Sequence, residues 1–279
     1  MISAIVLTYN SEDNIRRCLQ SIKGLDEIIV IDSHSDDNTT KIAEEFGARV
    51  IHRDYPGYSE QLEYGISIAK NEWIFVIDSD EEATPELITE INSISNNPDD
   101  NIDGYTVPRR FIFLGKFIEH GGWYPDHQYR FFRKDRSVPD HKEVHGAYQP
   151  KEYSGKLTGD IIHYSYRNLF DYVSRINVYT SLETSNKLNG NGGNGRNGTK
   201  KVKWYNMLIN PIPVFLKMFF LRKGYKDGMH GFILSLFSAM NNSILYAKLW
   251  EYGSSGKYGY EKPPITNEEL NEFRKRGDN

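Results

Sequence analysis

Short apolar, β-branched runs alternate with segments of helical periodicity over the first hundred residues, and this alternation constrains the fold more than any other feature of the chain. It is typical of a parallel β-sheet covered by helices. It predicts strands at residues 3–8, 27–32, 48–51 and 73–78. Three of these runs are mostly continuously apolar, as strands buried on both faces require. The sequence therefore predicts an α/β fold.

Helices are predicted between these strands. The first follows Ser11, which we expect to cap it, and the second covers residues 40–46 and ends at Gly47, which readily adopts the left-handed conformation. A third precedes the fourth strand. The fourth begins at Thr84-Pro85, where a capping hydroxyl is followed by a proline at the first helical position. Its inward-facing residues are predicted to be Leu87, Ile88, Ile91 and Ile94.

The pattern changes after residue 103. Residues 104–166 contain short aromatic strands separated by Gly, Pro and His, and Asn168 then caps a helix with apolar positions at Leu169, Tyr172, Val173 and Ile176. Residues 189–199 are rich in Asn and Gly, as in a flexible linker. We therefore divide the chain into a domain at 1–188, with halves at 1–103 and 104–188, a linker at 189–199 and a C-terminal region at 200–279.

Composition narrows the functional classes. With 279 residues, 38% hydrophobic content and a net charge of -4, the chain is an ordinary globular protein, and nothing suggests broad nucleic-acid binding. The single cysteine, Cys18, lies on the apolar stripe of the first predicted helix and is interpreted as core packing. No secretion signal and no run long enough to span a bilayer is recognised, which favours a cytoplasmic location.

Polar clusters follow three of the predicted strands. These are Thr8-Tyr9-Asn10, the acidic segment 32–37 and the acidic segment 78–82. In doubly wound sheets, ligands bind beyond the carboxyl ends of the strands. Any one cluster has an equally good interpretation as a helix cap, but the three together predict a binding site.

Asp78-Ser79-Asp80 is the sharpest local feature. Alternate residues of an extended segment share a face, so Asp78 and Asp80 would present two carboxylates to one hard cation, Mg²⁺ or Mn²⁺. Such an ion keeps positions open for the phosphate oxygens of a nucleoside diphosphate. An Asp-x-Asp triplet is common, and its place directly after a buried strand is what favours metal binding.

The chain resembles the family 2 glycosyltransferases, which have the GT-A fold. The matching residues, in matching order, are 4–10, Glu12, 27–33, Ser35, Asp36, Thr39 and 73–80. Within that family it is most similar to the bacterial lipopolysaccharide core β-1,4-glucosyltransferase group, through 111–115, 120–126, 129–132, 144–145, 163–167 and 246–251. The resemblance implies a Rossmann-like, mostly parallel sheet flanked by helices, with a helical C-terminal extension. It assigns nucleotide-sugar binding to residues 1–103 and the acceptor side to 104–188.

The resemblance also implies a reaction: inverting transfer of a hexose, by group similarity glucose, from a UDP-sugar to a lipopolysaccharide core or other surface-glycan precursor. Asp32 would contact the uracil, and Asp78 would face the ribose or the metal. Asp80 would bind the divalent metal with His163, although a histidine beside a tyrosine is more often a packed aromatic. The predicted nucleotide-sugar-binding residues are Thr8, Tyr9, Asn10, Glu12, Asp32, Ser33, Asp78 and Arg130.

An inverting transfer needs a base that takes the proton of the acceptor hydroxyl. The resemblance places it shortly before Val144-His145, where Asp140 is favoured and Glu143 comes second. Here the chain has one residue more than the family pattern, and Gly146 stands where relatives carry Glu. A solvated charged loop is the alternative. Trp123 and Tyr124 are candidates for stacking on an acceptor sugar, or equally for buried aromatics.

A second departure from the family follows Gln61. Leu62 and Glu63 stand where relatives carry a basic residue and an asparagine. If that cation helps to hold the donor, then one of the later arginines substitutes for it, or the donor preference differs. The candidates are Arg109, Arg110 and Arg130.

Residues 200–226 form a basic, aromatic segment with seven Lys or Arg and no acid. Asn210, Pro211 and Pro213 interrupt it too often for a spanning helix, but its composition suits a bilayer interface. Helices that pack on the catalytic domain are an equal alternative. Residues 229–250 favour packing, with a helical stripe of Phe232, Leu236, Ala239 and Met240.

Two other functions stay open. A sugar-phosphate nucleotidyltransferase would carry a Gly-rich, Arg-containing loop after the first strand, where this chain has Thr8-Tyr9-Asn10-Ser11. A nucleotide-sugar-binding protein without turnover is favoured by the unusual base region and by Leu62. An acidic pocket of the response-regulator type does not explain the similarity near the C-terminus.

Overall fold

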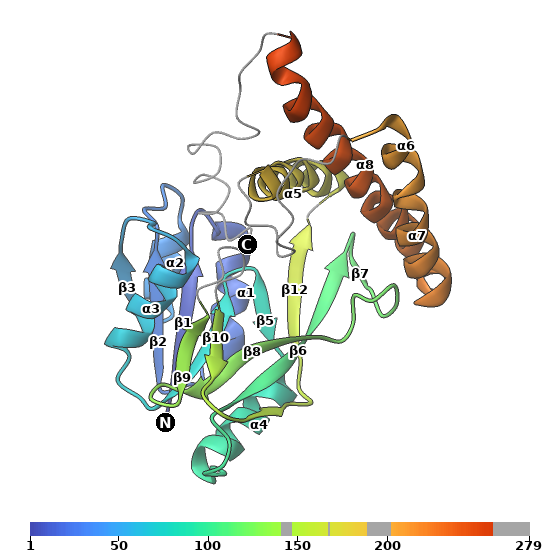
Figure 1. Cartoon of the computed structure of the whole chain (residues 1–279). Coiled ribbons are helices and arrows are strands. Elements are labelled where there is room, and N and C mark those ends of the chain that lie inside the picture. The colour runs from blue at the N-terminus through green and yellow to red at the C-terminus, as the bar shows by residue number, and fades with distance from the viewer. Residues whose placement is uncertain (141–146, 167, 189–201, 259–279) are drawn as a thin grey trace. The chain divides into compact units, whose positions relative to one another are not determined.

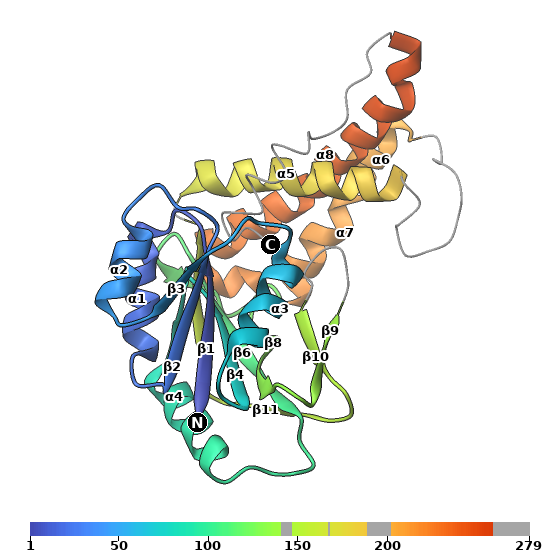
Figure 2. The same ribbon diagram turned by 90° about the vertical axis from the view of Figure 1, so that its left-hand side faces the viewer.

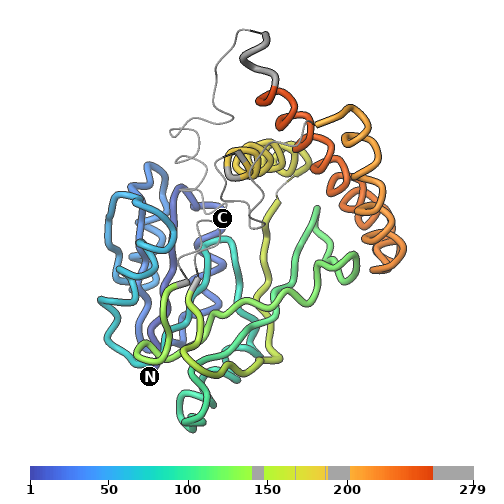
Figure 3. Tube along the Cα trace, viewed as in Figure 1, coloured from blue at the N-terminus to red at the C-terminus, as the bar shows by residue number. Residues whose placement is uncertain are grey.

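The fold is known from a computed structural model and is described for residues 1–140, 147–166, 168–188 and 202–258 (Figure 1, Figure 3). The chain forms two compact units. Unit 1 contains residues 1–111 and 125–165, and unit 2 contains residues 112–124 and the described chain from Tyr166 onward.

A mixed β-sheet forms unit 1, with strand order β3-β2-β1-β4-β8-β6-β12-β5. The first four strands in this order are parallel, and β8 then pairs antiparallel with both β4 and β6. The last strand, β5, is antiparallel to β12. The bounds are β1 Ile2–Thr8, β2 Glu27–Asp32, β3 Arg49–His52, β4 Trp73–Asp78, β5 Glu81–Ala83, β6 Gly104–Phe113, β8 Asp126–Arg133 and β12 Ile161–Tyr166.

The four predicted helices of the first hundred residues are present as α1 Glu12–Ile22, α2 Thr39–Glu45, α3 Tyr58–Ile68 and α4 Pro85–Asn96. Gly47 follows α2 with φ +72°, and Thr84 caps α4 by accepting the Leu87 N–H at 3.3 Å. Ser11 occupies the N-cap position of α1, as expected, but the capping bond expected from its side chain is missing. Its hydroxyl instead donates to the Tyr9 carbonyl at 3.1 Å and accepts from the Ser79 hydroxyl at 2.9 Å.

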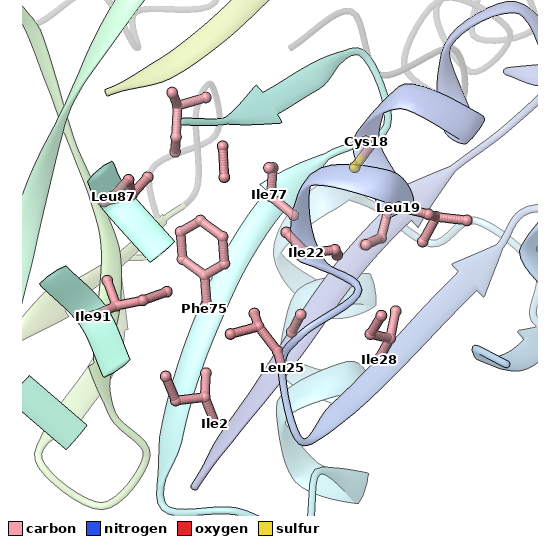
Figure 4. Packing of buried hydrophobic residues seen from close by; sticks show 14 of the residues in the cluster. Ile2, Cys18, Leu19, Ile22, Leu25, Ile28, Phe75, Ile77, Leu87 and Ile91 are labelled. Atoms are coloured by element: carbon pink, nitrogen blue, oxygen red, sulfur yellow. The ribbon is translucent and has the colours of Figure 1, made fainter. Parts of the chain in front are cut away.

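Helices cover both faces of the sheet in unit 1. On one face, α1, α2 and α4 enclose a core around Phe75, with Cys18, Leu19 and Ile22 from α1 and Leu87 and Ile91 from α4 (Figure 4). On the other face, α3 packs Leu62 and Ile66 against the strands. Cys18 is fully buried, as its place on an apolar stripe predicted. The α/β architecture predicted from the strand–helix alternation is confirmed.

Short strands complete the β-structure. In unit 1, β9 Ser137–Asp140 pairs antiparallel with β10 Ala147–Pro150, and β11 Ser154–Lys156 runs parallel to β6. In unit 2, β7 Lys116–Phe117 pairs with the last residues of β6.

Unit 2 is helical beyond β12. Its elements are α5 Leu169–Leu188, α6 Trp204–Ile209, α7 Pro211–Leu216, the π-helical turn η1 Lys217–Leu221, the 3₁₀ turn η2 Gly224–Asp227 and α8 Met229–Tyr258. Asn168 caps α5 by accepting the Asp171 N–H at 2.9 Å, as predicted. Figures 1 and 2 show α8 between α5 and the α6–α7 segment. Lys248 fastens α8 to α5 by donating to Thr180 Oγ1 at 2.8 Å and Ser181 Oγ at 2.6 Å.

Residues 229–250 pack on other helices, but the predicted stripe is only partly buried. Ala239 is buried, but Phe232, Leu236 and Met240 are exposed. The buried residues Leu234, Ser235, Ala239 and Leu245 lie on one face of α8 that is rotated away from the predicted stripe, and neighbouring helices pack on two sides of α8. No helix within the described ranges combines the length and apolarity needed to cross a bilayer. The linker predicted at 189–199 lies outside the described residues, and the domain boundaries stay a prediction.

Candidate active site

The polar clusters predicted at three strand ends meet at one edge of the sheet. In the parallel register, Thr8 of β1 lies beside Asp32 of β2, and Leu7 lies beside Asp78 of β4. The carboxyl ends of these three strands are therefore level. This is the edge at which doubly wound sheets bind ligands.

Hydrogen bonds lock the loop after β1 to the loop after β2. The Asn10 N–H donates to Ser35 Oγ at 2.9 Å, and Asn10 Oδ1 accepts the Asp36 N–H at 3.0 Å. Asn10 has φ +45°, a left-handed conformation that asparagine tolerates better than most residues. The Ser11 N–H donates to Thr39 Oγ1 at 2.7 Å, so the two loops form one rigid rim.

Glu12 belongs to the same rim. Its N–H donates to Asp37 Oδ2 at 3.1 Å, while its own carboxylate accepts the Asn38 N–H at 3.0 Å. Burial tends to raise the pKa of Asp37, but hydrogen bonds from Thr39 and Glu12 outweigh it and hold that pKa below its ordinary value. The side chain of Glu12 therefore holds the loop, and its predicted part in framing a nucleoside stays a prediction.

Asp32 is fully buried at the end of β2. Its carboxylate accepts the Ser35 N–H at 2.9 Å and lies 3.1 Å from Nδ1 of His52. The His52 ring stacks with His34 at a centroid distance of 6.2 Å. A carboxylate fixed in this way presents a defined oxygen pair, and its predicted contact with uracil stays a prediction.

Thr8 offers a buried hydroxyl whose Oγ1 has no hydrogen-bond partner in the described part of the chain. Buried polar atoms are nearly always bonded, so Thr8 Oγ1 is a candidate contact for a bound molecule. Ser33, in contrast, is already used, because its Oγ accepts from Gln61 Nε2 at 3.2 Å.

Asp78 is held by two side chains. Arg130 Nη2 donates to Asp78 Oδ2 at 2.6 Å, and the Tyr58 hydroxyl lies 3.4 Å from Oδ1. Arg130 is 8% exposed, and its burial opposes its charge. The carboxylates of Asp78 and Glu81 outweigh that effect and raise the pKa of the Arg130 guanidinium.

Glu81 is fully buried beneath this pair. One of its oxygens lies 3.5 Å from both Arg109 Nη1 and Arg130 Nη2, and the other accepts the Asp78 N–H at 3.0 Å. Arg109 is bound in turn by Asp126 at 2.7 Å. These carboxylates raise the pKa of Arg109 against the opposing effect of burial. These ion pairs and hydrogen bonds stabilise the turn that follows β4.

The expected geometry of Asp78-Ser79-Asp80 is wrong. Ser79 and Asp80 form a turn between β4 and β5, so the triplet is not an extended segment with two carboxylates on one face. The Glu81 carboxylate accepts the Asp78 N–H and stabilises this turn. Asp78 consequently pairs with Arg130, while Asp80 pairs with a different partner.

Asp80 and His163 come together as the resemblance implied. The pairing of β5 with β12 sets Glu81 beside His163, and the Tyr164 N–H donates to the Asp80 carbonyl at 3.1 Å. His163 Nε2 then lies 3.3 Å from Asp80 Oδ2. The Ser165 hydroxyl lies 2.7 Å from Nδ1 of the same ring and helps to orient it.

The Asp80–His163 pair fits a divalent metal. A carboxylate oxygen and an imidazole nitrogen about 3 Å apart suit neighbouring positions around one small cation. Among the described residues, no group of three or more His, Cys, Asp or Glu is arranged to hold an ion. Asp80 and His163 could hold such an ion as a pair, with its other positions open to further ligands.

Of the two predicted general bases, Asp140 lies within the described residues. Asp140 is the last residue of β9, where its backbone pairs with Ala147 of β10. Glu143 lies outside the described residues. The identity of the base stays a prediction.

The predicted acceptor residues Trp123 and Tyr124 belong to unit 2. Tyr124 packs edge-on against Phe117 at a centroid distance of 5.1 Å. The preceding residues are anchored within unit 2, because the His120 N–H donates to Asp227 Oδ2 at 2.8 Å and the Gly121 N–H donates to the Arg222 carbonyl at 2.9 Å. Their role stays a prediction.

The three arginines proposed to replace the missing cation are each in an ion pair: Arg109 with Asp126, Arg130 with Asp78, and Arg110 with Asp160 at 2.6 Å. Arg53 is a cation that the sequence analysis missed. It donates to Gln61 Oε1 at 2.7 Å, next to the contact between Gln61 and Ser33.

His52 is the last residue of β3, and Arg53 follows it. Both therefore lie at the same edge of the sheet as the three polar clusters. Polar residues at the end of the third predicted strand carry the same signal as the three clusters, so His52 and Arg53 were predictable in the same way. Tyr58 carried no comparable signal, because its role depends on a hydrogen bond from Arg130 of β8. Glu81 belongs to the acidic segment 78–82, but its ion pair with Arg130 could not be predicted from that segment.

Comparison with known proteins identifies the family. The model of glycosyl transferase family 2 matches residues 3–150, slightly more than half of the 279-residue chain. An uncharacterized glycosyltransferase of Rickettsia felis is 30% identical over 266 residues, covering 90% of this chain and 89% of the relative. The lipopolysaccharide core biosynthesis glycosyltransferase LpsC of Rhizobium meliloti is 24% identical over 265 residues, covering 90% and 92%.

Solved structures are similar at lower sequence identity. Staphylococcus aureus TarS 1-349 has a TM-score of 0.43 at 16% identity, covering 94% of this chain and 93% of TarS. Glucosyl-3-phosphoglycerate synthase of Mycobacterium tuberculosis, with Mn²⁺ and UDP-glucose, has a TM-score of 0.44 at 19% identity, covering 65% and 77%. Both scores are low, and neither likeness supports a functional assignment. The family model and the full-length sequence relatives do: this chain belongs to glycosyl transferase family 2.

Proposed function

We propose that this family 2 glycosyltransferase transfers a hexose, specifically glucose, from a UDP-sugar to a lipopolysaccharide core or another surface-glycan precursor, with inversion at the anomeric carbon. The observation that carries the proposal is the Asp80–His163 pair, with Nε2 and Oδ2 3.3 Å apart at the sheet edge where β1, β2 and β4 end. A two-ligand metal site beside a rigid polar rim suits a nucleoside diphosphate.

The rim formed by the loops after β1 and β2 is the proposed nucleoside site. The free hydroxyl of Thr8 and the fixed carboxylate of Asp32 are neighbours in the sheet register. Tyr9 and Asn10 follow directly, and Asn10 is held by the loop after β2. Oriented, buried hydrogen-bonding groups recognise a flat polar ring by exact pairing and penalise a mismatched one. His52 and His34 extend the same edge.

Asp80 and His163 are the proposed holders of the donor diphosphate through Mg²⁺ or Mn²⁺. When bound, such an ion neutralises the charge that develops on a departing nucleoside diphosphate. The Asp78–Arg130 pair and Glu81 fix the turn that positions Asp80. The ring of His163 is oriented by Ser165.

The acceptor hydroxyl must lose a proton as its oxygen attacks the anomeric carbon from the face opposite the leaving group. Asp140 is the proposed base, with Glu143 as the second candidate. Trp123 and Tyr124 are the proposed platform for an acceptor sugar ring. Support for a lipopolysaccharide-type acceptor comes from the similarity to LpsC, whose name places it in lipopolysaccharide core biosynthesis. A cytoplasmic location remains part of this proposal.

The test is turnover across a panel of UDP-, GDP- and CDP-sugars, with and without Mn²⁺, measured as release of the nucleoside diphosphate. The wild type should hydrolyse or transfer one UDP-sugar selectively, and Mn²⁺ should be required. Asp80→Asn should lower that rate by at least about 100-fold, since it removes an ionised metal ligand.

Asp135→Asn is the matched control, because Asp135 is an exposed aspartate in the turn after β8. It should keep the wild-type rate. Turnover that is equal in Asp80→Asn and the wild type would rule out the proposed metal site, and selectivity for a GDP- or CDP-sugar would replace the proposed donor.

A nucleotide-sugar-binding protein without turnover is the second candidate. The pairing of Arg109, Arg110 and Arg130 with carboxylates favours it, because none of them replaces the family cation missing at Leu62 without giving up a partner. Binding of a UDP-sugar with no product in the same panel, at every metal concentration, would establish that candidate.

A further inference from the structure

Unit 2 presents an apolar surface where a water-facing helix would carry polar residues. The segment 204–221 comprises α6, α7 and η1, and its exposed positions recur at a spacing of four residues. One row is Trp204, Leu208, Ile212, Leu216 and Phe220, and the row beside it is Tyr205, Ile209, Pro213, Lys217 and Leu221. Nine of these ten residues are apolar or aromatic, so the solvent-facing side of this segment is almost entirely apolar.

The exposure is substantial. The five residues of the first row expose between 45% and 73% of their surface, and Leu221 exposes 79%. Isolated exposed apolar residues are ordinary, but a continuous stripe over about five helical turns is not. We call this stripe, with its flanking cations, the basic-apolar face.

Packing within unit 2 fixes which side of the segment points outward. Pro211 is buried, and Phe215 and Phe219 contact Phe232 of α8 at centroid distances of 5.9 Å and 5.7 Å. The α6–α7 segment lies along α8 in Figures 1 and 2. The segment therefore already has an apolar side that packs inward, and the basic-apolar face is a second one.

Cations flank the stripe. Lys203 precedes it, Lys217 lies within it, and Arg222, Lys223 and Lys226 follow it, all of them exposed. Residues 202–226 include no acid. Asp227 comes next but is buried, and it accepts the His120 N–H at 2.8 Å, so it does not offset the charge of this surface.

We propose that the basic-apolar face docks on the surface of a bilayer that contains anionic phospholipids. Apolar side chains would enter the boundary between headgroups and acyl chains, while the lysines and arginines contact lipid phosphates. At about 1.5 Å per residue the segment is about 27 Å long, which suits a helix lying flat in the interface. A second copy of the chain is a poor occupant, because pairing two such faces would bring two cationic rims together.

Docking bears on the proposed function, and this step rests on it. Asp227 and Arg222, at the end of the basic-apolar face, hold the backbone of His120 and Gly121. The same loop carries Trp123 and Tyr124, the proposed acceptor platform. A docked unit 2 would therefore hold that loop near the membrane surface, where a lipid-linked acceptor is found.

The experiment is co-sedimentation of the full chain with vesicles, without any sugar nucleotide. One set is phosphatidylcholine alone, and the other contains 30% phosphatidylglycerol, about the anionic fraction that gives a strong surface potential. The wild type should bind the anionic vesicles at least 10-fold more tightly than the neutral ones, and binding should weaken as salt rises.

Two variants separate the apolar and ionic contributions. Leu208→Gln/Leu216→Gln and Lys217→Gln/Lys226→Gln should each weaken binding to anionic vesicles at least 10-fold. The controls are Tyr153→Gln, an exposed aromatic of unit 1, and Lys41→Gln/Lys70→Gln, two exposed lysines of unit 1. Both controls should bind as the wild type does. Circular dichroism melting of each variant shows that it is folded.

Trp204 gives an independent readout. Its emission should shift to shorter wavelength on anionic vesicles, and Trp204→Phe should lose the shift while retaining vesicle binding. The proposal is overturned if the wild type stays in solution, or if the Leu208→Gln/Leu216→Gln variant binds the vesicles equally well. It is also overturned if the wild type forms a dimer without vesicles and the same variant abolishes that dimer. Donor hydrolysis in solution should be the same in all variants, so this result is independent of the proposed chemistry.

Discussion

Arg130 shows how strongly one residue of the site depends on its partners. It is almost fully buried, between Asp78 at 2.6 Å and the buried carboxylate of Glu81 at 3.5 Å. Removing one member of a buried ion pair leaves a charge without compensation. We predict that Arg130→Met lowers the free energy of unfolding by about 3–5 kcal/mol, measured by urea denaturation.

Arg16→Met is the control for this prediction. Arg16 pairs with Glu45 at 2.9 Å, but both side chains are about half exposed, and such surface pairs contribute less than about 1 kcal/mol. Equal losses in the two variants would show that the Arg130 cluster does not support the fold. A further Glu81→Gln substitution should recover part of the loss in Arg130→Met, because it removes a buried uncompensated charge.

The pKa of Cys18 provides a test of the negative electrostatic potential that the site's carboxylates create. Burial, together with Glu81, Asp78 and Asp80, raises the pKa of its thiol well above the ordinary value of 9.0. Above pH 9 the unfolded thiol loses its proton while the folded one keeps it, so the unfolded state gains stability as pH rises. We predict that the wild type loses up to roughly 1 kcal/mol per pH unit more than Cys18→Ala between pH 9 and 10, measured by urea denaturation. Parallel losses in the two proteins would contradict this.

At the scale of elements, β12 must be held in register for His163 to meet Asp80. The loop before β12 packs closely on α4: a Cβ at Gly159 would lie 2.4 Å from the backbone nitrogen of Leu87. Backbone atoms cannot move aside as a side chain can. Gly159→Ala should therefore lower the free energy of unfolding by about 1–3 kcal/mol.

Gly24→Ala is the matched control for Gly159→Ala, because a Cβ at Gly24 would meet no atom within 4 Å. Thermal unfolding monitored by circular dichroism compares the two variants. An unchanged melting temperature in Gly159→Ala would show that the loop can move away from α4, and that the position of β12 is not fixed there.

Periodicity and capping residues predicted the elements of the first hundred residues well. Two features of the chain could not be predicted from periodicity and capping residues, because both depend on tertiary structure. The turn at Ser79-Asp80 depends on Glu81, whose carboxylate is held by Arg109 and Arg130 from strands later in the chain. The buried positions of α8 depend on its having helices on two sides. Neither arrangement is encoded in local sequence.

For the whole molecule, the edge that holds the site was predictable and its internal pairing was not. Polar residues after three strands indicated where Thr8, Asp32 and Asp78 would meet. Sequence spacing could not show that Arg130 forms an ion pair with Asp78. The proximity of Asp80 and His163 was predicted only from the resemblance to the family. The roles of these residues remain predictions, which one binding measurement can test together.

That measurement is the affinity for UDP by isothermal titration calorimetry, with and without Mn²⁺, in the wild type, Asp80→Asn and Asp135→Asn. If Asp80 and His163 hold a metal that in turn holds the diphosphate, Mn²⁺ should raise the affinity of the wild type and Asp135→Asn at least about 10-fold. It should change that of Asp80→Asn little. UDP affinity that is independent of Mn²⁺ in the wild type, or an undiminished effect of Mn²⁺ in Asp80→Asn, would contradict the account.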